Sequence, residues 1–393
     1  MPQGRRDRSA VVFCAGALPM KLFKCQSCSN LLYFENRTCQ CCGSTTGYIP
    51  RLEVLSAVEP AGSNWIARAD PGQLYRFCAN WERHACNWLT EVGSATPYCR
   101  ACQHNRTIPN VSNPAHHAMW IAMERAKRRL FYSLMKLALP LPLPGNPGVQ
   151  ALEFEFLTDE PGKKVMTGHE NGVITISLRE ADDAERERLR RGMGEPYRTL
   201  LGHFRHESGH FYWDALVQNG GHIDGFRAMF GDDRQIYDDK LKSYYASGPL
   251  KNWQQSFVSA YATMHPWEDF AETWAHYLHI VDTLEMAYAF GMTLSPRLAH
   301  DEALDANIQT NPYRAETIEE LIDAWLPVSF AANNLNRTMG QPDLYPFIIS
   351  KPVIEKLGYI HHLIRNQVAN TCREIGAKPR TCLTQPPQTR RAS

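Results

Sequence analysis

The chain has 393 residues, of which 44% are hydrophobic, so it can bury a large core and form two or three domains. Its formal net charge of +1 excludes a global electrostatic attraction to nucleic acid or to an anionic membrane. No apolar run approaches the roughly 20 residues that a membrane-spanning helix needs, so we expect no membrane partner.

Residues 1–19 join a basic stretch to about ten apolar residues, which gives them a faint likeness to a signal peptide. We interpret them instead as a disordered extension, or as sequence upstream of a start at Met20. The cysteine-rich segment that follows suits a reducing compartment, so we expect the protein in the cytoplasm.

The first cysteine cluster, CQSCSNLLYFENRTCQCCG, predicts a structural zinc site. The expected ligands are Cys25, Cys28, Cys39 and Cys42, which form two C-x2-C pairs separated by ten residues. The alternative is two disulfides, which would suit a secreted mini-domain better. Cys41 is a spare thiol, because Cys39 and Cys42 have the better spacing.

The second cluster, CANWERHACNWLTEVGSATPYCRAC, combines a loose cysteine pair with a C-x2-C pair. The expected ligands are Cys78, Cys86, Cys99 and Cys102. His84 competes with Cys86 for the second position, but four thiolates make the simpler closed site. The two quartets define a zinc-ribbon module over residues 20–110, whose folding energy comes largely from its metals. Because the module lacks a strongly basic face, we expect a protein partner on it rather than nucleic acid.

Beyond the ribbon module, the pattern predicts a helix, a linker and a larger domain, and the fold class is α+β. Residues 111–148 contain a helical repeat, NPAHHAMWIAMERAKRRLFYSLMKLAL, followed by a stiff proline-rich linker that marks a domain boundary. Residues 149–368 begin with strand patterns, LEFEFL and VITISL, and continue as mostly helical segments. Residues 369–393 lack a core pattern, so we expect a disordered tail.

The segment GHFRHESGHFYWD carries histidines on a helix with apolar and aromatic flanks. His206 and His210 lie four residues apart in an H-E-x-x-H sequence, so both imidazoles face one side and can reach one zinc ion. Glu207 adjoins the first ligand and is placed to take a proton from a water molecule at that ion. Gly209 costs roughly 1 kcal/mol relative to alanine inside a helix, which suggests that something approaches the backbone closely.

A catalytic zinc site of this kind needs a third protein ligand. The best stretch is YATMHPWEDFAETWAHYLHI, where Glu268 and Glu272 share one face of a predicted helix. One carboxylate can bind the metal while the other orients a ligand histidine, and the spacing alone leaves their order open. Weaker candidates for the third ligand are His265, His276, Asp269, Asp232 and Asp233.

These segments resemble zinc peptidases of the gluzincin kind, including a lethal-factor-type group with a Tyr–x6–Glu–x2–Ala–Glu pattern. Tyr261, Glu268, Ala271 and Glu272 match that pattern at the same spacing. From Met20 to about residue 368, the chain resembles a bacterial family of zinc-binding metallopeptidases with an N-terminal zinc ribbon, in segments such as FRHESGHFYWD and MGQPDLYPF. The resemblance implies that Glu268 is the third ligand, that Glu272 supports a ligand, and that Tyr261 stabilises the transition state.

The expected function is therefore zinc-assisted hydrolysis of a peptide or protein substrate, with one catalytic and two structural Zn²⁺ ions. Glu207 acts as the proton acceptor, and Tyr261 donates a hydrogen bond to the oxyanion, helped by a nearby histidine such as His203. An exposed VITISL strand is expected to pair with the substrate backbone. Two alternatives stay open: a zinc-ribbon adaptor whose second domain only binds, and a zinc amidase acting on a non-protein amide.

Overall fold

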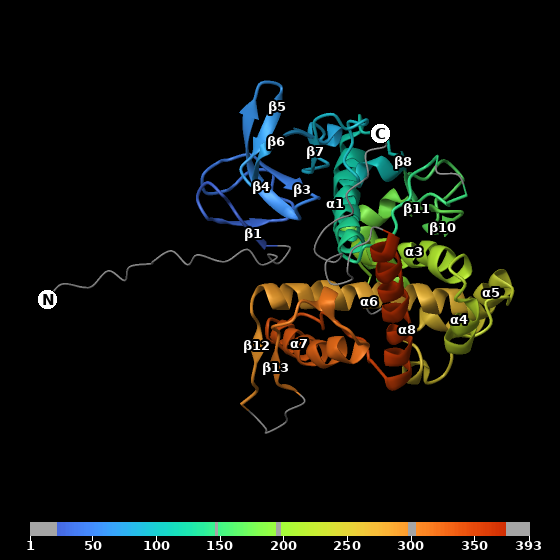
Figure 1. The fold of residues 1–393 in the computed structure, drawn as a ribbon. Helices are drawn as coiled ribbons and strands as arrows, with labels where there is room; N and C mark the ends of the chain where they lie inside the picture. Colours follow the sequence, from blue (N-terminus) through green and yellow to red (C-terminus); the bar gives the residue numbers. More distant parts are fainter. Residues whose placement is uncertain (1–21, 146–147, 194–197, 298–303, 375–393) are drawn as a thin grey trace.

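The structure is a computed structural model that describes residues 22–145, 148–193, 198–297 and 304–374 (Figure 1). The extension expected at residues 1–19 lies outside the described residues. So does most of the expected tail, residues 375–393. Its first six residues are not without structure, because the last helix continues through them to Glu374.

The N-terminal part holds a small hairpin and an antiparallel sheet of five strands. The hairpin consists of β1 (Leu22–Lys24) and β2 (Leu31–Tyr33). The sheet runs in sequence order through β3 (Thr46–Ile49), β4 (Val54–Ala61), β5 (Asn64–Ala67), β6 (Asp70–Phe77) and β7 (Leu89–Glu91). A tight turn joins β4 to β5, and Gly62 occupies the left-handed region there with φ 63°. This sheet was not predicted from the sequence.

Helix α1 (Pro114–Lys136) joins the N-terminal part to the rest of the molecule. Its N-terminus is capped by the side chain of Asn113, which accepts hydrogen bonds from the first turn, and Pro114 suits the first helical position. Tyr132 packs edge-on against Phe34 from the ribbon module at 5.6 Å between ring centroids. The next residue, Ser133, donates a hydrogen bond of 2.6 Å to Asp282 in the helical part of the molecule. The helix is therefore shared by both parts.

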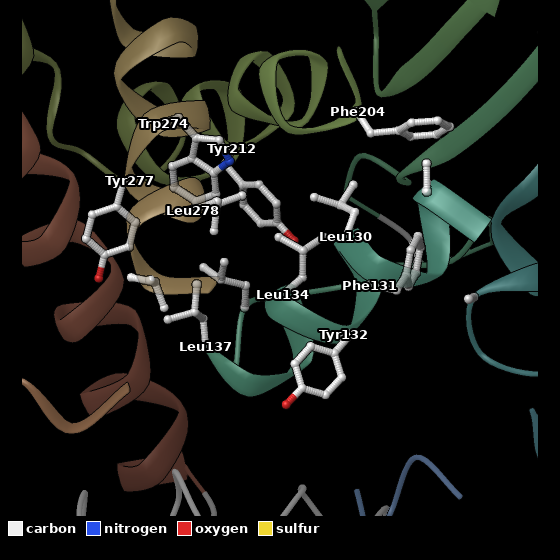
Figure 2. Packing of buried hydrophobic residues seen from close by; sticks show 14 of the residues in the cluster. Leu130, Phe131, Tyr132, Leu134, Leu137, Phe204, Tyr212, Trp274, Tyr277 and Leu278 are labelled. Carbon is white, nitrogen blue, oxygen red and sulfur yellow. The ribbon is translucent and has the colours of Figure 1, made fainter. Parts of the chain in front are cut away.

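One continuous hydrophobic core surrounds α1, and Figure 2 shows part of it. Side chains of α1 meet side chains of two further helices, α3 (Leu200–Tyr212) and α6 (Pro266–Ala289). The labelled members are Leu130, Phe131, Tyr132, Leu134, Leu137, Phe204, Tyr212, Trp274, Tyr277 and Leu278. Leu139 and Leu141 of the proline-rich segment are buried in the same core. That segment is packed structure rather than a free spacer, so the domain boundary that we placed there is crossed by the core.

A second sheet lies beside α3 and has the order β10-β11-β9-β8. Its strands are β8 (Asn105–Thr107), β9 (Glu153–Leu157), β10 (Gly168–Glu170) and β11 (Val173–Ser177). Strand β11, the VITIS segment, pairs with β9 on one side and β10 on the other. The expectation that this strand offers an exposed edge is therefore wrong, and β10 is the edge strand next to it.

The rest of the chain is mostly helical, which confirms the α+β class. The remaining helices are α2 (Asp183–Met193), a π-helical turn (Trp213–Gln218), α4 (Ile223–Phe230), α5 (Tyr237–Ser247), α7 (Ile318–Thr338) and α8 (Lys351–Glu374). A two-stranded ribbon is formed by β12 (Thr293–Leu294) and β13 (Ala306–Asn307). In Figure 1, α6 runs across the helical part, with α3, α7 and α8 against it. Among the described helices, none has the length and apolarity that crossing a membrane requires.

The glycine inside α3 is explained by the contact between α3 and α6. A Cβ atom at position 209 would lie 2.8 Å from the Cα atom of Ala271 and 3.2 Å from the Cβ atom of Trp274. The first of these atoms is part of the α6 backbone and the second is bonded directly to it, so neither can move without moving the helix. Gly209 therefore allows the two helices to approach until their ligand-bearing faces meet.

We expect Gly209→Ala to destabilise the protein by about 1–3 kcal/mol, the usual cost of overpacking, although alanine is the better helix former. Chemical denaturation measures the change. Gly192→Ala in α2 is the matched control, because nothing lies within 4 Å of a Cβ atom there. That control should be neutral or stabilising. Equal stability of the two variants would show that α3 and α6 do not approach as closely as described.

Candidate metal centres

The first cysteine quartet converges on one point next to the β1–β2 hairpin. The Sγ atoms of Cys25 and Cys42 are 3.7 Å apart, and those of Cys28 and Cys39 are 3.6 Å apart. Four sulfurs at about 2.3 Å from one zinc ion are about 3.8 Å from each other at tetrahedral angles, whereas a disulfide bond measures about 2.0 Å. The quartet therefore fits a metal ion and is not arranged as disulfides. Cys41 is exposed and lies outside the quartet.

The second quartet is buried beside the middle of α1, where Sγ of Cys102 lies 3.8 Å from Oε2 of Glu124. Its members are Cys78, Cys86, Cys99 and Cys102, all buried, with one ligand atom each within 4.8 Å of the others. The Sγ atoms of Cys86 and Cys99 are 3.7 Å apart, again the edge of a zinc–thiolate tetrahedron. His84 is exposed and contacts the guanidinium of Arg37, so it does not take the place of Cys86.

A buried guanidinium accompanies the second quartet. Burial acts to lower the pKa of Arg128, but the negative charges of Cys86, Glu124, Cys102 and Cys99 together outweigh burial and raise that pKa. The Arg128 side chain donates a hydrogen bond to the carbonyl oxygen of Ala85, beside the cysteine ligand. A fixed positive charge at this position suits a zinc ion held by four thiolates, because that complex carries two negative charges.

The third centre joins α3 and α6. The Nε2 atoms of His206 and His210 are 3.2 Å apart, and the Oε2 atom of Glu268 lies 3.0 Å from the first and 3.5 Å from the second. Nitrogen and oxygen ligands at about 2.0–2.1 Å from a tetrahedral zinc ion are about 3.3 Å from each other. The three atoms thus form one face of a coordination tetrahedron whose fourth corner is not filled by a protein group of this cluster. These residues fit zinc.

Glu272 lies one helical turn after Glu268 and supports the first histidine. Its Oε1 atom is 2.6 Å from Nδ1 of His206, so Nδ1–H donates to Glu272 and Nε2 is left with its lone pair toward the cluster. Burial acts to raise the pKa of Glu272, but the hydrogen bond and the charge of His206, with smaller contributions from His276 and Ser259, together outweigh burial and bring that pKa to about 2. The carboxylate is therefore charged and holds the ring in the tautomer that a metal ligand needs.

Two further predicted residues lie beside the cluster. Glu207 is buried, its Oε2 atom has no hydrogen-bond partner, and burial raises the pKa of its carboxyl group. The ring of Tyr261 lies 6.1 Å from the ring of His206. Burial, with the charge of Glu268 second, raises the pKa of Tyr261 well above its ordinary value, so the phenol keeps its proton. The site thus holds a carboxyl group with one unpartnered oxygen and a hydroxyl donor next to the cluster.

Three residues near the cluster were missed from the sequence. Tyr237 donates a hydrogen bond of 2.7 Å to Oε1 of Glu268, and Trp267 packs on His210 with 3.7 Å between ring centroids. His169 of β10 stacks toward His210 at 6.3 Å, and burial lowers its pKa to about 3, so it is neutral. Trp267 could have been predicted to lie near the cluster because it precedes Glu268 in the sequence. No sequence spacing places Tyr237 or His169 there.

The weaker candidates have partners elsewhere. The Nε2 atom of His203 lies 3.4 Å from Oε2 of Glu180. This contact does not fit the role at the oxyanion that we expected for His203. The alternatives for the third ligand do not join the cluster either. Asp269 pairs with Lys356, Asp233 with Arg227 and Asp232 with Arg234, while His276 contacts the hydroxyl of Tyr345 and His265 caps α6.

The fold combines two parts: a ribbon module that holds two cysteine quartets, and a helical part that holds a His–His–Glu cluster. This combination is typical of zinc-binding, metallopeptidase-like proteins. Residues 116–363 match the family described as "putative zinc-binding metallo-peptidase", and residues 22–113 match a family of zinc-ribbon domains. The chain belongs to that metallopeptidase family. The predicted membership of a zinc-binding metallopeptidase family with an N-terminal zinc ribbon is thereby confirmed.

Similar proteins occur in mycobacteria. Uncharacterized proteins of Mycobacterium tuberculosis and Mycobacterium bovis are each 40% identical over 347 residues, which cover 88% of this chain and 95% of each relative. No solved structure matches the chain significantly. The similarity to these relatives therefore covers nearly the whole chain, but their names give no activity.

Proposed function

We propose that this protein is a zinc-dependent peptidase that hydrolyses peptide bonds at the His206, His210 and Glu268 cluster. The observation that carries the proposal is the buried Glu207 carboxyl group, whose Oε2 atom has no hydrogen-bond partner, beside three ligand atoms with the edges of a zinc tetrahedron. A structural zinc site needs no such base, because its coordination is closed by four protein ligands.

The chemistry divides among the side chains of the cluster. A Zn²⁺ ion bound here would polarise the substrate carbonyl and acidify a water molecule. Glu207 accepts the proton of the attacking water at a carboxylate oxygen and returns it to the leaving amine. Tyr261 donates its phenolic hydrogen to the oxyanion that forms from the substrate carbonyl. Glu272 keeps the ring of His206 in place throughout.

Strand β10 is the proposed docking edge for the substrate main chain. Among the strands of the described residues it pairs with β11 alone, and its middle residue, His169, faces His210. An extended peptide added to this edge would have its backbone hydrogen bonds satisfied while it passes the cluster. This role replaces the one that the sequence suggested for the VITISL strand.

We expect three zinc ions per purified chain, one in each group of ligands, when metal is measured by elemental analysis. One zinc ion or fewer in folded protein would contradict this stoichiometry.

A reducing compartment keeps four-thiolate sites from oxidising, and we propose the cytoplasm as that compartment.

The two cysteine quartets should differ in their effect on stability. Cys99→Ser is expected to lower the unfolding temperature of the whole chain by roughly 5 °C or more, which for 393 residues corresponds to about 4 kcal/mol. The reason is that β8 follows the second quartet directly and pairs with β9, while His104 contacts the carbonyl oxygen of Leu152 at 2.6 Å. Cys25→Ser is the matched comparison, because the first quartet lies beside the peripheral β1–β2 hairpin. Equal losses in thermal unfolding would contradict this difference.

The decisive test of function is hydrolysis of a peptide library by the zinc-loaded protein. Cleavage that disappears after chelation and returns with zinc is the expected result. Two other outcomes identify the alternatives: cleavage of non-protein amides alone indicates an amidase, and binding of peptides without any turnover indicates an adaptor.

A further inference from the structure

Helix α5 (Tyr237–Ser247) is held to the molecule in an unusual way. None of its residues, all of which the structure describes, is buried. Its inner side, formed by Tyr237, Leu241 and Tyr244, is only half-buried, so the helix gains little stability from packing, and isolated helices of 11 residues are marginal in water. Figure 1 places α5 at the outer end of the helical part, beyond α4. Its position must therefore depend on a few specific contacts.

Those contacts come from tyrosines that reach the metal cluster. Tyr237 donates its hydroxyl hydrogen to Oε1 of Glu268 at 2.7 Å. About two turns further along the helix, the ring of Tyr244 packs edge-on against Tyr261 at 5.8 Å between centroids. The metal ligand and the proposed oxyanion donor are therefore both contacted from α5.

The segment around α5 is fixed at both ends. Before the helix, the backbone carbonyl of Gln235 contacts Nε2 of His265 at 3.1 Å. After it, Lys356 of α8 donates a hydrogen bond of 2.8 Å to the carbonyl oxygen of Ser256. Gly248, with φ 76°, ends the helix in a conformation that side chains rarely adopt. If α5 moves, only the residues between Gln235 and Ser256 move with it. This stretch lies next to the cluster, because Tyr237 contacts Glu268.

We propose that Tyr237 is a positioning residue that latches α5 over the metal centre and holds Glu268 as a ligand through one oxygen. The hydrogen bond from Tyr237 occupies Oε1, which leaves Oε2 to point at the two histidines. The proposal rests on the proposed assignment of Glu268 as a zinc ligand. By linkage, a latch that strengthens zinc binding is itself strengthened by zinc to the same extent.

The test uses the full chain with Tyr237→Phe, and Tyr245→Phe as the matched control. Tyr245 lies on the same helix and is 67% exposed. Zinc affinity of the cluster, measured by competition with a chelator, should fall roughly 10–100-fold in Tyr237→Phe, as for other groups that orient a ligand. The control should bind zinc like the wild type. In the cobalt-substituted protein, Tyr237→Phe should weaken the visible absorption, because a freed Oε1 allows a fifth coordination bond.

Hydrogen exchange of the wild-type protein tests the latch without any variant. Saturation with zinc should slow exchange of the α5 amides by the same factor of roughly 10–100, while amides of α2 stay unchanged. Unaltered zinc affinity and cobalt absorption in Tyr237→Phe would overturn the positioning role, and unaltered exchange in α5 would overturn the latch. None of these measurements needs turnover. A protein that binds zinc as described but cleaves no peptide would refute the proposed function and leave this inference standing.

Discussion

Replacement of Glu207 by glutamine is expected to abolish most of the hydrolysis while zinc stays bound. Glutamine preserves the length and volume of the side chain, and neither histidine ligand nor Glu268 is altered. What disappears is the proton acceptor, whose loss typically reduces turnover by a factor of roughly 10²–10⁴. Steady-state cleavage of a peptide identified in the library screen, together with zinc content, measures both quantities on one preparation.

Two controls make that result specific. Glu319→Gln makes the same chemical change at an exposed position in the first turn of α7, and its activity should equal that of the wild type. Metal-depleted wild-type protein gives the background rate. If Glu207→Gln cleaved as fast as the wild type with zinc bound, another group would be the base, and the unpaired oxygen of Glu207 would need a different explanation.

The metal clusters were largely predictable because ligand spacing depends on local geometry. Histidines four apart on a helix face one side, and cysteines three apart in sequence form a knuckle, whatever surrounds them. The sequence could not rank Glu268 above Glu272 without a family resemblance, since both lie on one face of α6. In the structure the two differ in what they reach: Glu268 lies near both Nε2 atoms, and Glu272 lies on the far nitrogen of His206.

The parts that were missed depend on contacts distant in sequence. The five-stranded sheet was missed because its strands, such as SAVEPAGSNWIARADPG, contain proline, glycine and charged residues without clear alternation. The proline-rich segment suggested a spacer because proline stiffens a chain, yet Leu139 and Leu141 give it enough apolar surface to join the core. The contact of Tyr237 with Glu268 spans 31 residues and two helices, so no local pattern could indicate it.

Alanine substitutions should separate the two carboxylates of α6. Glu268→Ala leaves two protein ligands, so we expect the chain to lose one zinc ion of three while both cysteine sites stay filled. Glu272→Ala leaves all three ligands but removes the acceptor for Nδ1–H of His206, so zinc should stay bound with roughly 10–100-fold lower affinity. Zinc titration against a chelator of known affinity distinguishes loss from weakening.

Tyr261→Phe is the matched control for these two variants, because it alters the site without touching a ligand. Its hydroxyl is proposed to act on the oxyanion alone, so zinc affinity should stay close to wild type while turnover falls. The three variants then give three patterns. Glu268→Ala loses the zinc ion, Glu272→Ala binds it more weakly, and Tyr261→Phe binds it normally but cleaves more slowly. If Glu272→Ala emptied the site and Glu268→Ala did not, the roles would be reversed. The 3.0 Å and 3.5 Å separations of Glu268 Oε2 from the two histidines would then not describe a ligand.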